Sequence, residues 1–180
     1  MSGLATESAL AFAERDPQAT RTRLLTWQDP FASLAAGAGL SGLEYMGAIA
    51  AGEIPPPPIA VTLNMSLVEV SEGRAIFEGR PGEEHYNPIG VVHGGYAATM
   101  LDSALGCAVH STLPAGSAYT TLTLETKFVR AVGRDQTRVR AEAEVLHRGR
   151  RQATAQARLT DAETGKLLAH ATTTCIILEA

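Results

Sequence analysis

The segment from Gly94 to Val109 most constrains the fold, because it reads as one long helix whose side chains are apolar or small on every side. This pattern is typical of a helix that is buried all round. Its only charge is Asp102. Because an unpartnered carboxylate out of water costs several kcal/mol, Asp102 must be paired, hydrogen-bonded, protonated or placed in a water-filled pocket. The alternative to a functional role is that Asp102 only caps a neighbouring loop.

Six β-prone stretches accompany this helix, two before it and four after it. They run from Ile59 to Val70, Arg74 to Arg80, Tyr119 to Val132, Gln136 to His147, Arg151 to Thr160 and Lys166 to Leu178. Glycines and acidic residues between them favour hairpin turns. Since the helix is the only element long enough to cover an antiparallel sheet, the sequence predicts an α+β fold with a six-stranded antiparallel sheet.

The run Pro55-Pro56-Pro57-Pro58 divides the chain, because it favours polyproline II and fits neither a helix interior nor a central strand. We expect a helical N-terminal extension over residues 1–54 and the main domain over residues 59–180. Short helices are predicted in the extension from Ala5 to Arg15, Asp29 to Ala36 and Ser41 to Ala51, with Asp29-Pro30 and Ser41 as start signals.

The composition excludes some classes of function. The 180 residues include 15 Lys+Arg against 19 Asp+Glu, a net charge of -4, and only 5% are aromatic. The sequence has no cluster of basic residues that could bind nucleic acid, and no apolar run approaches the roughly 18 residues of a membrane span. Without a basic start typical of a signal peptide, the chain is expected to be cytoplasmic, with neither a nucleic acid nor a membrane as partner. Cys107 and Cys175 lie in apolar stretches without zinc-like spacing and are expected to be small core residues.

The residues just before the helix favour a functional interpretation. Asn87 to Gly95 reads Asn-Pro-Ile-Gly-Val-Val-His-Gly-Gly, which places glycines and polar residues at a helix N-terminus. Amides there carry the positive end of the helix dipole and can hold a developing oxyanion, and Asn87 can add a side-chain donor. Taken alone, a Gly-Gly pair usually only makes a turn, and a lone His93 is more often structural than catalytic.

Geometry separates these groups within one chain. Gly94 and Asp102 are eight residues apart, about 12 Å along a helix. An attacking group must come within about 3 to 3.5 Å of a carbonyl carbon whose oxygen is held by those amides. We therefore expect a homodimer in which Asp102 of a second subunit completes each site.

The combined motif resembles that of hotdog-fold acyl-CoA thioesterases of the PaaI-like branch. It consists of Asn87-x-x-Gly90-x-x-His93-Gly94-Gly95 followed by Asp102. The resemblance extends over about residues 63–178 and includes the Glu84 to Pro88 lead-in, the strand at Tyr119 to Thr123 and the hairpin at His147 to Arg151. It implies a long helix wrapped by the sheet, with dimers that often pair into tetramers.

The resemblance also implies roles for individual residues. Gly94 and Asn87 polarise the thioester carbonyl, and Asp102 of the facing subunit acts as general base or as nucleophile. His93 lies near the leaving sulfur, and Thr121 helps to orient the water. The match of Thr121 is one of several, because Thr120 and Thr123 are close by. Strand alternation places Thr121 and Thr123 on one face and Thr120 on the other.

These residue types suit thioester hydrolysis, which needs carbonyl polarisation and an oxygen nucleophile but little help for its leaving group. No serine-hydrolase elbow, phosphate loop or metal motif is visible, so we expect neither metal nor cofactor. Gly95 and the hairpin residues Arg148, Gly149 and Arg150 are candidates for substrate binding. Arginines on a hairpin are either a solvated turn or ligands for the phosphates of coenzyme A, and the sequence favours neither.

Two other classes of function remain open. A non-catalytic acyl-CoA-binding regulator is one, although residues 1–52 are acidic and contain no basic recognition helix. An enoyl-CoA hydratase-like enzyme is the other, and it needs an acid and a histidine at the substrate's α and β carbons. The sequence does not define the acyl group.

Overall fold

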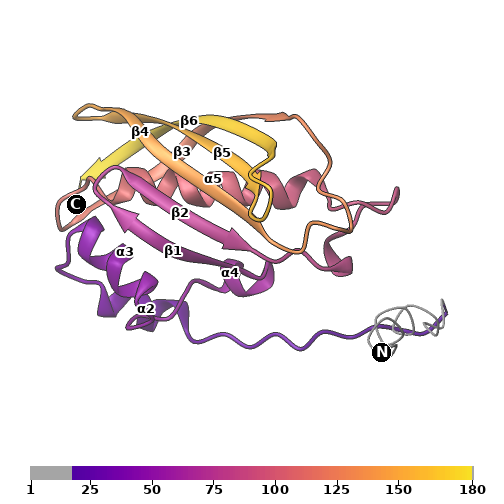
Figure 1. Ribbon diagram of the computed structural model, residues 1–180. Helices are drawn as coiled ribbons and strands as arrows, with labels where there is room; N and C mark the ends of the chain where they lie inside the picture. The colour runs from indigo at the N-terminus through magenta and orange to yellow at the C-terminus, as the bar shows by residue number, and fades with distance from the viewer. Residues whose placement is uncertain (1–17, 180) are drawn as a thin grey trace, which may run out of the picture.

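The sheet curves around one long helix in the computed structural model, which describes residues 18–179 (Figure 1). Its six strands are all antiparallel and lie in the order β1-β2-β4-β5-β6-β3. Their bounds are β1 Met65–Ser71, β2 Arg74–Gly79, β3 Ser117–Phe128, β4 Val139–Arg148, β5 Gln152–Asp161 and β6 Leu167–Glu179. The predicted α+β fold is confirmed, while the helix predicted from Ala5 to Arg15 lies outside the described residues.

The core lies between the sheet and helix α5 (Gly94–His110), which contacts all six strands. Met100, Leu101, Leu105 and Val109 are fully buried on the side of α5 that faces the sheet. Opposite them the strands present mostly alanine, at Ala141, Ala143, Ala153, Ala155, Ala157, Ala169 and Ala171. Small side chains on the sheet let the helix approach closely, which is how an aromatic-poor chain fills its core.

The expectation that the helix is buried all round is wrong for one face of α5. Gly95, Ala98, Thr99, Asp102, Ser103 and Cys107 are only partly covered, and their spacing of three or four residues makes them one stripe. We call these six residues the open stripe. The physical reason is that a single sheet covers one side of a helix, so the opposite side of α5 has no partner among residues 18–179.

Helices α2 (Pro30–Ala36) and α3 (Gly42–Ala50) lie before the run of prolines. Both predicted start signals are confirmed: Asp29 accepts a hydrogen bond from the Phe31 amide at 2.9 Å, and Ser41 forms a capping box with Glu44. The Gly42 amide donates to the Leu113 carbonyl at 2.9 Å, and any Cβ on Gly42 would overlap the backbone of His110. Helix α3 therefore packs against the C-terminal end of α5.

The prediction of a single strand from Ile59 to Val70 is wrong in its first half. Residues Pro58–Thr62 form helix α4, in which Pro58 occupies the first turn and the Thr62 hydroxyl donates to the Pro58 carbonyl at 2.9 Å. A proline with its fixed φ starts a helix readily, and here it outweighs the β preference of Ile59 and Val61. The strand from Gln136 also begins later than predicted, at Val139.

The expectation that Thr121 and Thr123 share a face is wrong as well. Thr121 pairs with Cys175 and Thr123 with Thr174, so Leu122 is an extra residue that forms a bulge in β3. A bulge reverses the alternation of side chains beyond it. Thr121 therefore faces the helix, while Thr123 is exposed on the other side of the sheet.

Candidate active site

One group of candidate residues lies in the loop that enters α5. The Asn87 side-chain oxygen accepts hydrogen bonds from the amides of Ile89 at 3.1 Å and Val91 at 3.3 Å, and Gly90 takes a φ of 77° that suits glycine. Because its oxygen is used within the loop, the Nδ2 amide of Asn87 points away from these contacts. No acceptor among residues 18–179 forms a hydrogen bond with this Nδ2 group. Asn87 thus offers a fixed side-chain donor.

His93 is the N-cap of α5. Its Nδ1 accepts a hydrogen bond from the Gly95 amide at 2.8 Å, and its own amide donates to the His85 carbonyl at 2.8 Å. Since Nδ1 is the acceptor, the neutral ring carries its proton on Nε2. The Gly95 amide is therefore engaged, whereas the Gly94 amide has no acceptor in the described part of the chain. We call Asn87, His93 and Gly94 the amide half-site.

A hollow of about 290 Å³ borders the amide half-site. Asn87, His93, Gly94 and Phe128 line it, together with residues 129–132 from the end of β3 onward. Phe128 is 59% exposed, and a Cβ on Gly94 would lie 3.3 Å from its ring. An apolar ring beside free amides can hold the uncharged part of a ligand next to the group that the amides polarise.

A second group lies two turns further along α5. The Thr121 hydroxyl donates to Oδ1 of Asp102 at 3.0 Å, which links the middle of the helix to β3. Asp102 is half-buried on the open stripe, and its Oδ2 has no donor among residues 18–179. Of the three threonines considered, Thr121 is the one that contacts the carboxylate. We call Asp102 and Thr121 the carboxylate half-site.

Two cysteines lie near Asp102. Burial, with a smaller contribution from the Asp102 charge, raises the pKa of the partly covered Cys107 thiol to about 12, and burial raises the pKa of the Cys175 thiol as well. Both thiols are therefore protonated near neutral pH and are poor nucleophiles. Cys175 is a core residue and Cys107 packs against the core, as predicted. The carboxylate is the chemically competent group on this side of the helix.

The candidate arginines lie nearer to the carboxylate half-site than to the amide half-site. Thr121 pairs with Cys175, Cys175 with Ala153, and Ala153 with Arg148. Directly paired residues share a face of the sheet, so Arg148 lies on the helix side, three strands or about 14 Å from Thr121.

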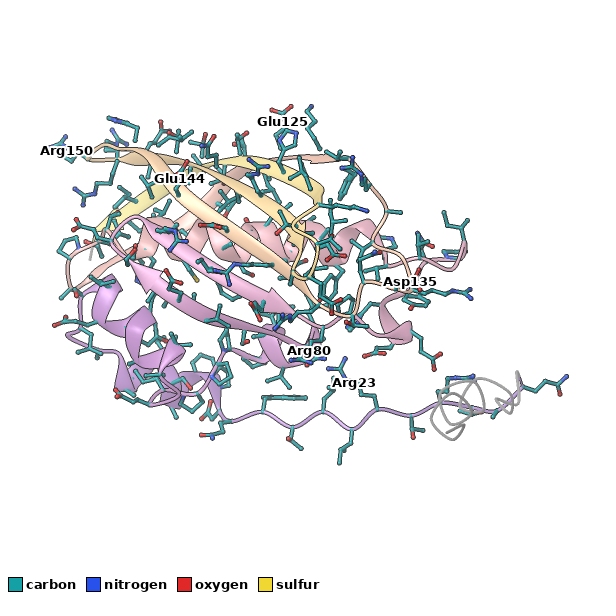
Figure 2. The ribbon with its side chains drawn as sticks, in the orientation of Figure 1. Arg23, Arg80, Glu125, Asp135, Glu144 and Arg150 are labelled. Carbon is teal, nitrogen blue, oxygen red and sulfur yellow. The ribbon has the colours of Figure 1, made fainter. Side chains whose placement is uncertain are left out.

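Figure 2 shows Arg150 at one end of the molecule and Asp135 at the other. Asp135 marks the end of the molecule that holds the amide half-site, because its neighbour Arg134 donates to the Gly90 carbonyl at 3.3 Å. The hairpin and the amide half-site are thus far apart within one chain. In the part of the chain that the structure describes, no carboxylate pairs with Arg148, Arg150 or Arg151.

Sequence reasoning assigned no role to Phe128, because an aromatic residue at a strand end gives no signal of its own. Nor did it identify His93 as a helix cap, since histidine is not among the preferred residues there. Within residues 18–179, no three His, Cys, Asp or Glu side chains gather in a way that could hold a metal ion. None of the helices in that range is long and apolar enough to cross a membrane.

The comparisons with known proteins agree with this architecture. The family model of the thioesterase superfamily matches residues 89–168, which include both half-sites except Asn87. A putative thioesterase from Ralstonia eutropha JMP134, described as a phenylacetic acid degradation-related protein, is 31% identical. The match covers 73% of this chain and 98% of that structure, with a TM-score of 0.66. This chain therefore belongs to the thioesterase superfamily and has the hotdog fold.

Two further solved structures are similar. A mutant of the phenylacetic acid degradation protein PaaI from Thermus thermophilus is 26% identical, covers 67% of this chain and 98% of its own, and has a TM-score of 0.60. A thioesterase family protein from Silicibacter pomeroyi is 23% identical over 75% of this chain and 99% of its own, with a TM-score of 0.67, and shows the fold alone. No curated protein matches this chain. The resemblance to PaaI-like thioesterases is confirmed.

Proposed function

We propose that this protein hydrolyses acyl-CoA thioesters to a free acid and coenzyme A. The observation that carries the proposal is that one helix presents, at separate places, two groups that hydrolysis needs. A free amide lies at its start, and a carboxylate with an unbonded oxygen lies about 12 Å further on. The amide half-site has donors but no base, and the carboxylate half-site has a base but no free helix N-terminal amide.

A second copy of the chain completes the site in this proposal. Two features support it: the open stripe of α5 has no partner within the described chain, and β3 is an edge strand with unpaired backbone groups and an exposed Leu122. Both features adjoin the carboxylate half-site. A partner docked there by a two-fold axis brings its own amide half-site to Asp102. Pairs of such dimers then form the tetramer expected from the family.

The reaction follows from the groups available. The thioester oxygen lies between the Gly94 amide and Asn87 Nδ2 of one subunit, which stabilise the negative charge that develops on it. Asp102 of the other subunit takes a proton from water, whose oxygen forms the new bond to the carbonyl carbon, with Thr121 fixing the carboxylate. The carbon–sulfur bond breaks, and the coenzyme A sulfur leaves as a thiolate that accepts a hydrogen bond from Nε2–H of His93. The proton that Asp102 took from water then passes to the sulfur or to solvent, which restores the carboxylate.

Asp102 can alternatively attack the carbonyl itself, which breaks the carbon–sulfur bond, releases coenzyme A and forms a mixed anhydride. A single turnover in H₂¹⁸O tests this route. Label found in Asp102 shows an anhydride that is hydrolysed at the aspartyl carbon, whereas a general base places the label in the product acid.

The remaining substrate contacts are also proposals. Gly95 lets the substrate approach the backbone, and Arg148, Gly149 and Arg150 of the subunit that supplies Asp102 bind the phosphates of coenzyme A. The hollow beside Phe128 receives the acyl group. Because two similar structures are described by their relation to phenylacetic acid degradation, aryl-acetyl thioesters are the first substrates to test. No metal or cofactor takes part in the proposed reaction.

Asp102→Asn tests the proposal most directly, because it preserves shape and removes the base. We expect kcat for acyl-CoA hydrolysis to fall by about 10² to 10⁴, with folding nearly intact. Thiol release and enoyl absorbance are followed together, which separates hydrolysis from hydration. Near-normal turnover by a folded Asp102→Asn dimer contradicts the site, and a wild type that binds acyl-CoA without releasing thiol is a regulator.

A further inference from the structure

An extended arm, residues 18–29, precedes α2 and runs along the molecule below β1 and α4 (Figure 1). It lies outside the region that the thioesterase family model matches, so its role is not defined by that family. Two of its side chains, Arg21 and Arg23, turn back towards the domain. Figure 2 shows Arg23 beside Arg80, close to the end of β2.

Arg23 joins two elements that are distant in sequence. Its Nη2 donates to the Val61 carbonyl at 3.0 Å and its Nη1 to the Thr62 carbonyl at 3.2 Å, at the C-terminal end of α4. Nη1 also donates to Glu84 Oε1 at 2.8 Å, in the 3-10 turn Glu83–His85. The guanidinium therefore satisfies helix-end carbonyls and fastens the turn to them. Arg21 adds an ion pair with Glu83 of the same turn at 2.5 Å.

This turn holds the amide half-site. The His85 carbonyl accepts the His93 amide at 2.8 Å, immediately before Gly94. The His85 ring is nearly buried, accepts the Gly82 amide at 3.0 Å, and packs on Tyr96 with ring centroids 4.9 Å apart. A displacement of the turn thus acts on both the cap and the first turn of α5.

We propose that Arg23 is a positioning residue for the amide half-site: by tying the 83–85 turn to the end of α4, it holds His93 and the Gly94 amide in place. Two hydrogen bonds make this connection, Arg23 to the Glu84 carboxylate and the His93 amide to the His85 carbonyl, and Glu84 and His85 are consecutive residues of the turn. Because catalytic donors act through precise placement, loosening this chain lowers turnover more than it weakens substrate binding. The activity part of this inference rests on the proposed thioesterase function.

The test compares Arg23→Ala, Arg23→Lys and the control Arg80→Ala. Arg80 is also an exposed arginine at this end of the molecule, and its guanidinium has no bonded partner among residues 18–179. For Arg23→Ala we expect kcat to fall about tenfold and KM to change by less than about twofold. Lysine recovers only part of the loss, since a single ammonium lacks the planar fork that reaches both elements.

Hydrogen exchange measured by mass spectrometry gives a readout without substrate. Peptides that cover residues 83–95 are expected to exchange faster in Arg23→Ala than in wild type or Arg80→Ala, while peptides from β5 are unchanged. Glu84→Gln, which keeps the shape of the turn, gives a smaller change of the same kind and replaces Arg23→Ala if that variant does not fold.

Unchanged exchange over residues 83–95, or an equal loss of kcat in Arg80→Ala, overturns the role of Arg23. A wild type without thioesterase activity overturns the proposed function instead, and the exchange measurement then still decides whether Arg23 holds the turn.

Discussion

A mixed dimer tests the central claim that each site is built from two chains. One partner carries Asp102→Asn, which removes the base, and the other carries Asn87→Asp. The aspartate at position 87 keeps an oxygen for the amides of Ile89 and Val91 but loses the Nδ2 donor. Each change therefore disables one half-site with little disturbance of the loop or the helix.

The magnitudes follow from the chemistry of each half. Loss of a general base lowers kcat by about 10² to 10⁴. Loss of an oxyanion donor lowers it by about 10² to 10³. Both homodimers should then retain at most about 1% of wild-type turnover. In the mixed dimer one site collects both substitutions and the other collects none, so its turnover should return to about half of the wild-type value.

The assay uses two affinity tags on co-expressed chains, tandem purification of the mixed dimer, and thiol release from an acyl-CoA. A co-expressed dimer in which one chain carries both substitutions and the other is wild type is the matched control. In that arrangement each site receives one disabled half, and turnover should stay near the background. If the first mixed dimer is as inactive as its parents, or if both mixed dimers are equally active, the two half-sites do not come from different chains.

Two further predictions concern the arginine hairpin and the helix end. Arg150→Ala should raise KM for acyl-CoA about fivefold, equivalent to about 1 kcal/mol, and leave KM for a short thioester without the nucleotide unchanged. Arg158→Ala, which changes an exposed arginine on β5, is the control, and equal effects of Arg150→Ala on both substrates would remove the phosphate contact. His110 lies between the rings of Tyr45 and Tyr119, and burial lowers its pKa. The unfolded chain then binds more protons, so the free energy of unfolding should decrease as pH falls below about 6.5, and less steeply in His110→Phe; equal pH slopes in urea titrations would contradict this.

The local parts of the fold could be predicted because short-range signals decide them. The start of α5 at Gly94, the caps at Asp29 and Ser41, and the positions of β5 and β6 follow from periodicity, capping chemistry and turns within a few residues. The eight-residue spacing between Gly94 and Asp102 in the sequence already predicts that the two half-sites lie apart within one chain.

The remaining parts depend on contacts between distant residues. The bulge at Leu122 depends on how β3 pairs with β6, so the sequence alone did not distinguish Thr121 from Thr123. Helix α4 is an exception, because there a local proline start prevails over the β-branched residues that follow it. Arg23 contacts residues 38 and 61 positions away, and no pattern near Arg23 indicates them.

The open stripe also explains why α5 tolerates a carboxylate at its centre. Within one chain Asp102 remains partly open to water, so it carries little of the desolvation cost of a buried charge. A second subunit that covered it with apolar groups would impose that cost, so a stable dimer must bring donors to Asp102. On an antiparallel pair of α5 helices, Gly94 of one meets Asp102 of the other when the two-fold axis passes beside Ala98, midway between them. Ala98 is small and lies on the open stripe, so in the proposed dimer the helices can approach closely at that point, and the Gly94 amide of one chain faces Asp102 of the other across the bound thioester and its water.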